Sequence, residues 1–163
     1  MSHRSLLLLY DVGFSPQAPF LIKDLADRAG LAIVEIDIRR FSRRAGPNGP
    51  PPGRAHLSVS IPLERDEGWF EIDGELVVRE TEKHLESAVA VIAIGTTTAL
   101  SGSVILAFIS TIIHTRALPT LYAYHGDSPI VRQDNLHPLV VMRRYVDDDG
   151  LAGLVGSFIR NKI

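Results

Sequence analysis

Residues 5–38 read SLLLLYDVGFSPQAPFLIKDLADRAGLAIVEIDI, two apolar runs on either side of a segment with helical spacing. Ser5–Tyr10 is a short continuous apolar run, which is typical of a strand covered on both faces. Pro19–Ala29 spaces its apolar residues as a helix does, and Gly30 follows as a C-cap residue. Leu31–Ile38 is β-branched and alternating, which predicts a second strand. Together these elements predict a βαβ unit with a right-handed crossover.

The second half of the chain continues the alternation of strands and helices. Ala88–Ile94 reads AVAVIAI, the most buried strand by composition, and Ala99–His114 is a helix that is apolar almost all round. Two further strands are predicted over Leu118–Tyr124 and Pro138–Tyr145, and a final helix over Leu151–Ile159. The pattern predicts an α/β fold with a Rossmann-like, mainly parallel sheet and helices on both faces.

The segment between these halves breaks the rhythm. Residues 39–54 are predicted to form a loop, and the Pro/Gly-rich part at 45–54 is expected to be mobile. Residues 55–78 have period-2 character and are interpreted as a β-hairpin insertion in the sheet. The finer elements expected here are strands over His56–Leu63 and Gly68–Val78, an exposed turn at Glu64–Glu67, a hairpin turn at Asp73-Gly74 and a short polar helix over Arg79–Ser87.

Length, charge and cysteine content narrow the class of protein. At 163 residues and 17.9 kDa, residues 1–163 are expected to form a single domain. The 17 Lys and Arg residues against 19 Asp and Glu give a net charge of −2, which disfavours a broad surface for long nucleic acid. Because the chain has no cysteine, disulfides and thiolate chemistry are excluded. A reducing compartment is permitted, and the expected location is cytoplasmic.

The uncharged run at residues 88–113 raises the question of a membrane. It exceeds the roughly 20 residues that span a bilayer, but seven Ser and Thr residues interrupt it. A strand, a turn and a buried helix explain the run without a membrane, and no membrane partner is expected.

The strongest candidate site follows the Ala88–Ile94 strand. Gly95 allows a tight exit from the strand, and hydroxyl groups and backbone N–H groups then meet a helix N-terminus, which favours an anion such as phosphate. Neither a Walker A loop nor a GxGxxG motif is present. The alternative is that the threonines cap a buried helix and line an interface. The ligand-binding candidates in this segment are Gly95, Thr96, Thr98, Ser101 and Ser103, with Thr97 as a catalytic candidate.

A second polar turn follows the first strand, at residues 11–17. In open α/β sheets, ligands bind beyond the carboxyl ends of the strands, where two such turns can meet. The alternative is structural: Ser15 caps the first helix, with Pro16 at its first position. The candidates here are Asp11, Gly13, Phe14 and Gln17 for binding and Ser15 for catalysis.

Two isolated residues complete the candidate site. His125 follows the Leu118–Tyr124 strand and is a candidate general acid or phosphate donor, although a lone loop histidine is more often structural. Arg39 follows the Leu31–Ile38 strand, where it either contacts an anionic ligand or belongs to a solvated basic edge. The acidic run at 147–149 is interpreted as a solvated loop, so no metal site and no cofactor is predicted.

Two of these segments resemble one protein family. LLLLYDVGFSPQ at 6–17 is similar to the opening strand and loop of CRISPR-associated Rossmann-fold (CARF) domains, and VIAIGTTTALSGS at 91–103 resembles the second signature of that family. The resemblance implies a homodimer that binds a cyclic oligoadenylate across its two-fold axis and, in some members, cleaves the ring slowly without a metal. Carried over by position, Ser15, Gln17 and residues 96–98 would face the ligand. The second signature usually carries a basic residue after its Gly-Thr pair, where this chain has Thr97-Thr98-Ala99.

Three functions therefore compete on the sequence. The first is cyclic oligoadenylate binding by a homodimer, with or without ring cleavage in the manner of a hydrolase of antiviral defence. The second is a nucleotide-binding or small-molecule enzyme of another Rossmann-like family. The third is a non-enzymatic interaction subunit that uses the apolar helix at 99–113 as its partner surface.

Overall fold

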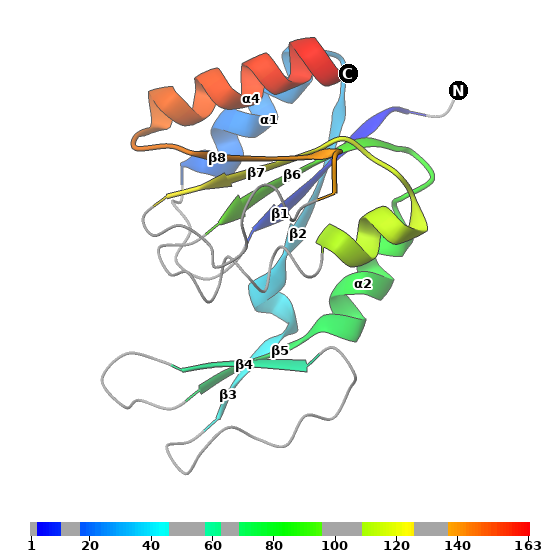
Figure 1. Cartoon of the computed structure of the whole chain (residues 1–163), viewed down its shortest axis with the longest axis vertical. Helices are drawn as coiled ribbons and strands as arrows, with labels where there is room; N and C mark the ends of the chain where they lie inside the picture. The colour runs from blue at the N-terminus through cyan, green and yellow to red at the C-terminus, as the bar shows by residue number, and fades with distance from the viewer. Residues whose placement is uncertain (1–2, 11–16, 46–57, 63–68, 96–108, 126–136) are drawn as a thin grey trace.

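The computed structural model describes residues 3–10, 17–45, 58–62, 69–95, 109–125 and 137–163. Within these ranges, the larger sheet has five strands, all parallel, in the order β2-β1-β6-β7-β8 (Figure 1). In chain order its strands are β1 (Ser5–Tyr10), β2 (Ala32–Asp37), β6 (Ala88–Gly95), β7 (Thr120–Tyr124) and β8 (Val140–Arg144). The sequence predicted all five strands to within three residues at each end.

The sheet is doubly wound, because β1 leads outward to β2 and the chain then returns past β1 to β6 and continues to β7 and β8. Helices cover both of its faces, as the sequence predicted. Figure 1 shows α1 (Ala18–Arg28) beside α4 (Asp148–Lys162) on one face, while α2 (Gly74–Glu82) and the helical residues 109–115 lie on the other. The protein therefore has an α/β, Rossmann-like fold.

Alternate residues of β1 build the two halves of the core. Leu6 and Leu8 pack with residues of α1 and α4, whereas Leu7 and Leu9 pack with α2 and with residues 109–113. All four leucines are fully buried. A strand that is apolar at successive positions can be buried only between two layers, which is why SLLLLY requires helices on both faces.

The helix after β6 is amphipathic in its described part. Ile109, Ile112 and Ile113 are buried in the core, while Ser110 and His114 are exposed. Its apolar residues here are used inside the domain. Among the described residues, none of the helices combines the length and the apolar character needed to cross a membrane.

A second, three-stranded antiparallel sheet lies beyond the carboxyl end of β2. It is reached through the 3-10 helix η1 (Ile38–Phe41), and Figure 1 shows it apart from the larger sheet. Its strand order is β3-β5-β4, formed by β3 (Ser42–Ala45), β5 (Trp69–Asp73) and β4 (Ser58–Pro62). The β4–β5 pairing is the antiparallel pair that the sequence predicted.

Several local predictions in this region are wrong. The predicted loop at 39–54 contains a strand, because the backbones of Arg43 and Arg44 pair with Glu71 and Phe70 of β5. The pairing is decided by a partner strand distant in sequence, which local composition does not report. Residues 46–54, the Pro/Gly-rich part, lie outside the described residues.

The predicted hairpin turn at Asp73-Gly74 is the start of a helix. The strand predicted over Gly68–Val78 therefore ends at Asp73, and the helix predicted over Arg79–Ser87 runs from Gly74 to Glu82. The side chain of Asp73 accepts a hydrogen bond from the backbone N–H of Leu76 at 3.2 Å, which makes Asp73 the N-cap of α2. Aspartate followed by glycine serves both as a turn and as a cap. Val77 and Thr81, four residues apart and both fully buried, favour the helix.

The acidic run at 147–149 is likewise part of a helix rather than a solvated loop. The Asp147 carboxylate accepts a 2.7 Å hydrogen bond from the N–H of Gly150, and Asp148 and Asp149 occupy the first turn of α4. Their negative charges there complement the positive end of the helix dipole.

We expect Asp147→Ala to lower the free energy of unfolding by about 1 kcal/mol, since it removes the capping acceptor from α4. Urea denaturation followed by circular dichroism measures the change. Asp147→Ser is the matched control, because serine also accepts from an N–H at this position and should retain most of the stability. Equal loss in both variants would show that the cap does not stabilise α4.

Candidate functional site

The five strands of the larger sheet bring five strand ends to one edge. Their last residues are Tyr10, Asp37, Gly95, Tyr124 and Arg144. The register sets these residues in rows: Tyr10 lies opposite Asp37 on one side and Ile94 on the other. The strand order reverses between β1 and β6, and ligands of open α/β sheets bind in the crevice outside such a point.

Four of the predicted site residues lie within the described ranges, namely Gln17, Arg39, Gly95 and His125. The other nine lie outside them: Asp11, Gly13, Phe14, Ser15, Thr96, Thr97, Thr98, Ser101 and Ser103. The structure therefore fixes the strand ends from which the two predicted turns leave the sheet.

These two strand ends are neighbours. β1 and β6 are adjacent and parallel, so the chain leaves Tyr10 and Gly95 at the same edge of the sheet. Gln17 is exposed at the N-cap position of α1, and its side chain makes no capping hydrogen bond. Ser15, which the structural alternative makes the cap of the first helix, lies outside the described residues.

His125 is exposed directly after β7 and contacts an aromatic ring. Its ring centroid lies 5.6 Å from that of Tyr145, with the two planes tilted by 52°. Tyr145 is buried, and its N–H donates to the carbonyl of Tyr124 at 2.9 Å. The end of β7 places the imidazole of His125 at the carboxyl edge, two strands away from β1. Arg39 is in η1, just beyond the end of β2, and its side chain is outside the described part of the structure.

Sequence reasoning missed a cation at this edge. Arg144 is the last residue of β8, is exposed, and lies opposite Tyr124 in the register. The side chain of the preceding Arg143 has a partner, because its Nη1 donates to the carbonyl of Met142 at 2.9 Å. The available signal was the predicted strand over Pro138–Tyr145, which has two arginines just before its last residue, at the edge where the other polar residues collect.

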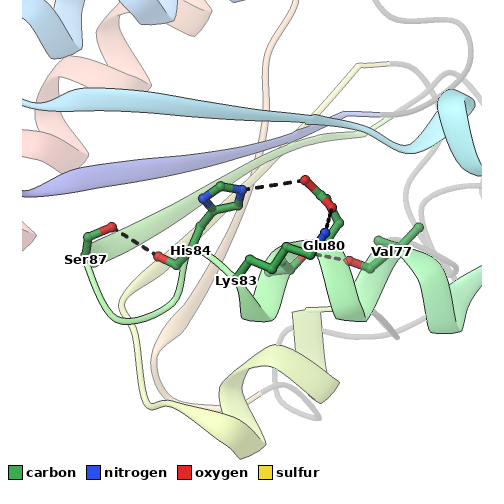
Figure 2. A network of polar contacts seen from close by, with 6 residues as sticks. Val77, Glu80, Lys83, His84 and Ser87 are labelled. Carbon is green, nitrogen blue, oxygen red and sulfur yellow. Dashed lines mark hydrogen bonds and ion pairs between the residues drawn. The ribbon is translucent and has the colours of Figure 1, made fainter.

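A second group of polar side chains lies at the opposite, amino edge, where α2 ends and β6 begins. Figure 2 shows the carboxylate of Glu80 between Lys83 and His84, with Lys83 Nζ at 2.9 Å and His84 Nε2 at 3.6 Å. The Ser87 hydroxyl donates to the carbonyl of His84, and its oxygen is 3.0 Å from that of Ser5 in β1. Arg116 donates to the carbonyls of Leu85 and Glu86. These bonds tie the segment before β6 to β1 and to the end of the 109–115 helix, which is a structural task.

Neither edge holds a metal-binding cluster: among the described residues, no three His, Asp or Glu side chains are grouped to hold an ion.

Comparison with known proteins identifies no family for this chain. No protein-family model matches the chain. No curated protein matches it either. Among solved structures, the chain is similar to a de novo designed Rossmann 2x3 fold protein determined in solution by NMR. That likeness has a TM-score of 0.49 and 11% identity, and it covers 100% of this chain and 94% of the designed one.

The contacts of Glu80 generate a prediction about its titration. The hydrogen bond and charge of Lys83 are the main causes that hold the pKa of Glu80 below its ordinary value of 4.5, and His84 contributes less. Since the pKa of Glu80 is lower in the folded state than in the unfolded state, the contacts of its carboxylate stabilise the folded protein above the unfolded-state pKa. This contribution to stability is lost as the pH falls through the folded-state pKa.

We expect Lys83→Met to raise the pKa of Glu80 towards its ordinary value, as measured by NMR titration of the Glu80 carboxyl carbon. The matched variant His84→Asn should raise it by a smaller amount. A larger effect from the histidine change would contradict the assignment of Lys83 as the main partner.

Proposed function

We propose that the chain binds an anionic nucleotide ligand at the carboxyl edge of its parallel sheet. The observation that carries the proposal is the adjacency of β1 and β6 at the point where the strand order reverses. The two polar segments singled out in the sequence follow these two strands directly. Backbone N–H groups at helix starts favour negative charge, which suits phosphate groups at this edge.

The ligand proposed is a cyclic oligoadenylate. This part of the proposal is supported by the resemblance of LLLLYDVGFSPQ and VIAIGTTTALSGS to the two signatures of CARF domains. In the sheet, these segments contain β1 and the end of β6, so the resemblance falls on the two strands beside the reversal point. A ring of phosphates joined by riboses presents several anionic groups at once, and two turns from neighbouring strands suit such a ligand.

Cleavage of the ring is proposed as a slow, metal-independent reaction. The ribose 2′-hydroxyl attacks the adjacent phosphorus, the bond from phosphorus to the 5′-oxygen breaks, and a 2′,3′-cyclic phosphate forms. The proton of the 2′-hydroxyl leaves to solvent, and the 5′-oxygen receives a proton from His125 as general acid. Ser15 and Thr97 are proposed to align the attack and to donate hydrogen bonds to the developing charge.

We expect calorimetry to detect binding of cyclic tri-, tetra- or hexa-adenylate by the wild-type chain. The variant Thr96→Val with Thr97→Val should weaken this binding by about 1.5–3 kcal/mol for each hydrogen bond lost to the charged ligand. Valine keeps the shape of threonine and removes its hydroxyl, so the free energy of unfolding should change little.

Matched controls separate this assignment from a general effect of the substitutions. Thr115→Val removes a hydroxyl whose only described hydrogen bond is to the carbonyl of Thr111 in its own helix, and it should leave binding unchanged. Flat calorimetric traces with all three rings would reject the cyclic oligoadenylate assignment. Unchanged affinity in the double valine variant would reject the role of the two threonines.

The proposal includes a homodimer, with the ring bound across the two-fold axis. In the described part of the helix predicted over 99–113, Ile109, Ile112 and Ile113 are buried in the core, so a partner surface there would not use them. We expect light scattering to give twice the mass of one chain at micromolar concentration. A single-chain mass, with and without the ring present, would contradict the homodimer.

A further inference from the structure

Arg144 lies in the same row of the sheet as Gly95. The register places Gly95 opposite Tyr124, and Tyr124 opposite Arg144, at the carboxyl ends of three consecutive strands. Neighbouring strands are separated by about 4.8 Å, so the Cα atoms of Gly95 and Arg144 are about 10 Å apart.

The alternation of side chains along β8 places Arg144 on the face shared with Tyr124. Val140 and Met142 pack with the core half that contains Tyr124, whereas Val141 and Tyr145 pack with the opposite half. Arg144 continues the first series, because side chains in a strand alternate between faces. This is also the face covered by residues 109–115, the described part of the helix that follows β6.

The Gly95 end of the site has no charge of its own to offer an anion. From residue 88 to residue 113 the sequence contains no charged side chain. Helix dipoles and N–H groups contribute only partial charges, so a phosphate bound there lacks a full countercharge from its own segment. Any cationic side chain that contacts such a phosphate therefore has to come from another element of the carboxyl edge.

The side chain of Arg144 is available for this task. It is exposed, and it has no hydrogen bond or ion pair with any residue in the described part of the chain. The nearest acidic run in the sequence, residues 147–149, belongs to the cap and first turn of α4, which packs on the opposite face. Arginine presents a planar fork of donors that matches two phosphate oxygens, which suits it to this role.

We infer that Arg144 binds a phosphate of the ligand at the Gly95–Tyr124–Arg144 row and supplies the positive charge that the segment after β6 lacks. The inference rests on the proposed function, because it requires an anionic ligand at the carboxyl edge. It adds a binding residue that neither the sequence pattern nor the resemblance points to. The alternative explanation is that Arg144 binds no ligand and that its charge only prevents the edge strand β8 from pairing with strands of other molecules.

The test uses inorganic tripolyphosphate as the probe, followed by NMR of the labelled full chain. We expect saturable shifts of the backbone amides of Gly95, Tyr124 and Arg144. Arg144→Gln should weaken tripolyphosphate binding about tenfold or more, because a charge-assisted, bidentate contact is lost. The affinity of Arg144→Lys for tripolyphosphate should lie between those of the wild-type chain and Arg144→Gln, since lysine retains the charge and loses the planar pair of donors.

Arg143→Gln is the matched control. It removes the same charge one residue earlier, from the other face of β8, and should change the affinity by less than about twofold. Equal weakening by Arg143→Gln and Arg144→Gln would overturn the inference, because it would reveal a diffuse charge effect. The absence of saturable shifts in the wild-type chain would overturn it as well. Both substitutions are at exposed positions, and the amide spectra report directly whether each variant is folded.

Parallel titrations with a cyclic oligoadenylate separate this inference from the proposed function. If the ring binds and Arg144→Gln binds it equally well, Arg144 is not a ligand residue and the proposed function stands. If tripolyphosphate binds through Arg144 and no ring binds, the cyclic oligoadenylate assignment fails and the anion-binding role of Arg144 stands.

Discussion

The parallel pairing of β1 with β6 is the constraint on which the rest of the structure depends. β1 has a neighbour on each side, and its four leucines are fully buried. Parallel strands cannot be joined by a tight turn, so each connection must cross over the sheet, and the crossing helices supply the two layers that bury those leucines. The doubly wound topology is therefore what buries both faces of β1.

The same pairing decides where polar residues can gather. Parallel strands end at a common edge, and the apolar runs of this chain each give way to polar residues at that end. The amino edge has a different character: Glu80, Lys83, His84 and Ser87 bond to one another or to the backbone, and Ser87 also contacts β1. The described polar groups at the amino edge therefore have structural partners, whereas the polar segments predicted from the sequence follow the strands at the carboxyl edge.

The larger sheet could be predicted because burial on both faces leaves a direct record in composition, as in SLLLLY and AVAVIAI. The insertion could be predicted only in part. Asp73-Gly74 is compatible with a turn and with a helix start, and the choice is made by Val77 and Thr81, whose burial depends on tertiary packing. Local composition at Arg43 and Arg44 indicates a loop, and pairing with β5 overrides it. Such choices depend on partners that are remote in the sequence.

The candidate site divides along the same line. Gln17, Gly95 and His125 could be selected from the sequence, because each directly follows a strand or opens a helix and so lies at the carboxyl edge by local rules alone. Arg144 could not, since its relation to Gly95 exists only through two successive strand pairings, β6 with β7 and β7 with β8. The segment at the proposed phosphate site has no charged side chain, so it offers no countercharge of its own. The register of the sheet places the exposed Arg144 in the same row as Gly95, and this relation is the basis for the inferred role of Arg144 as the countercharge.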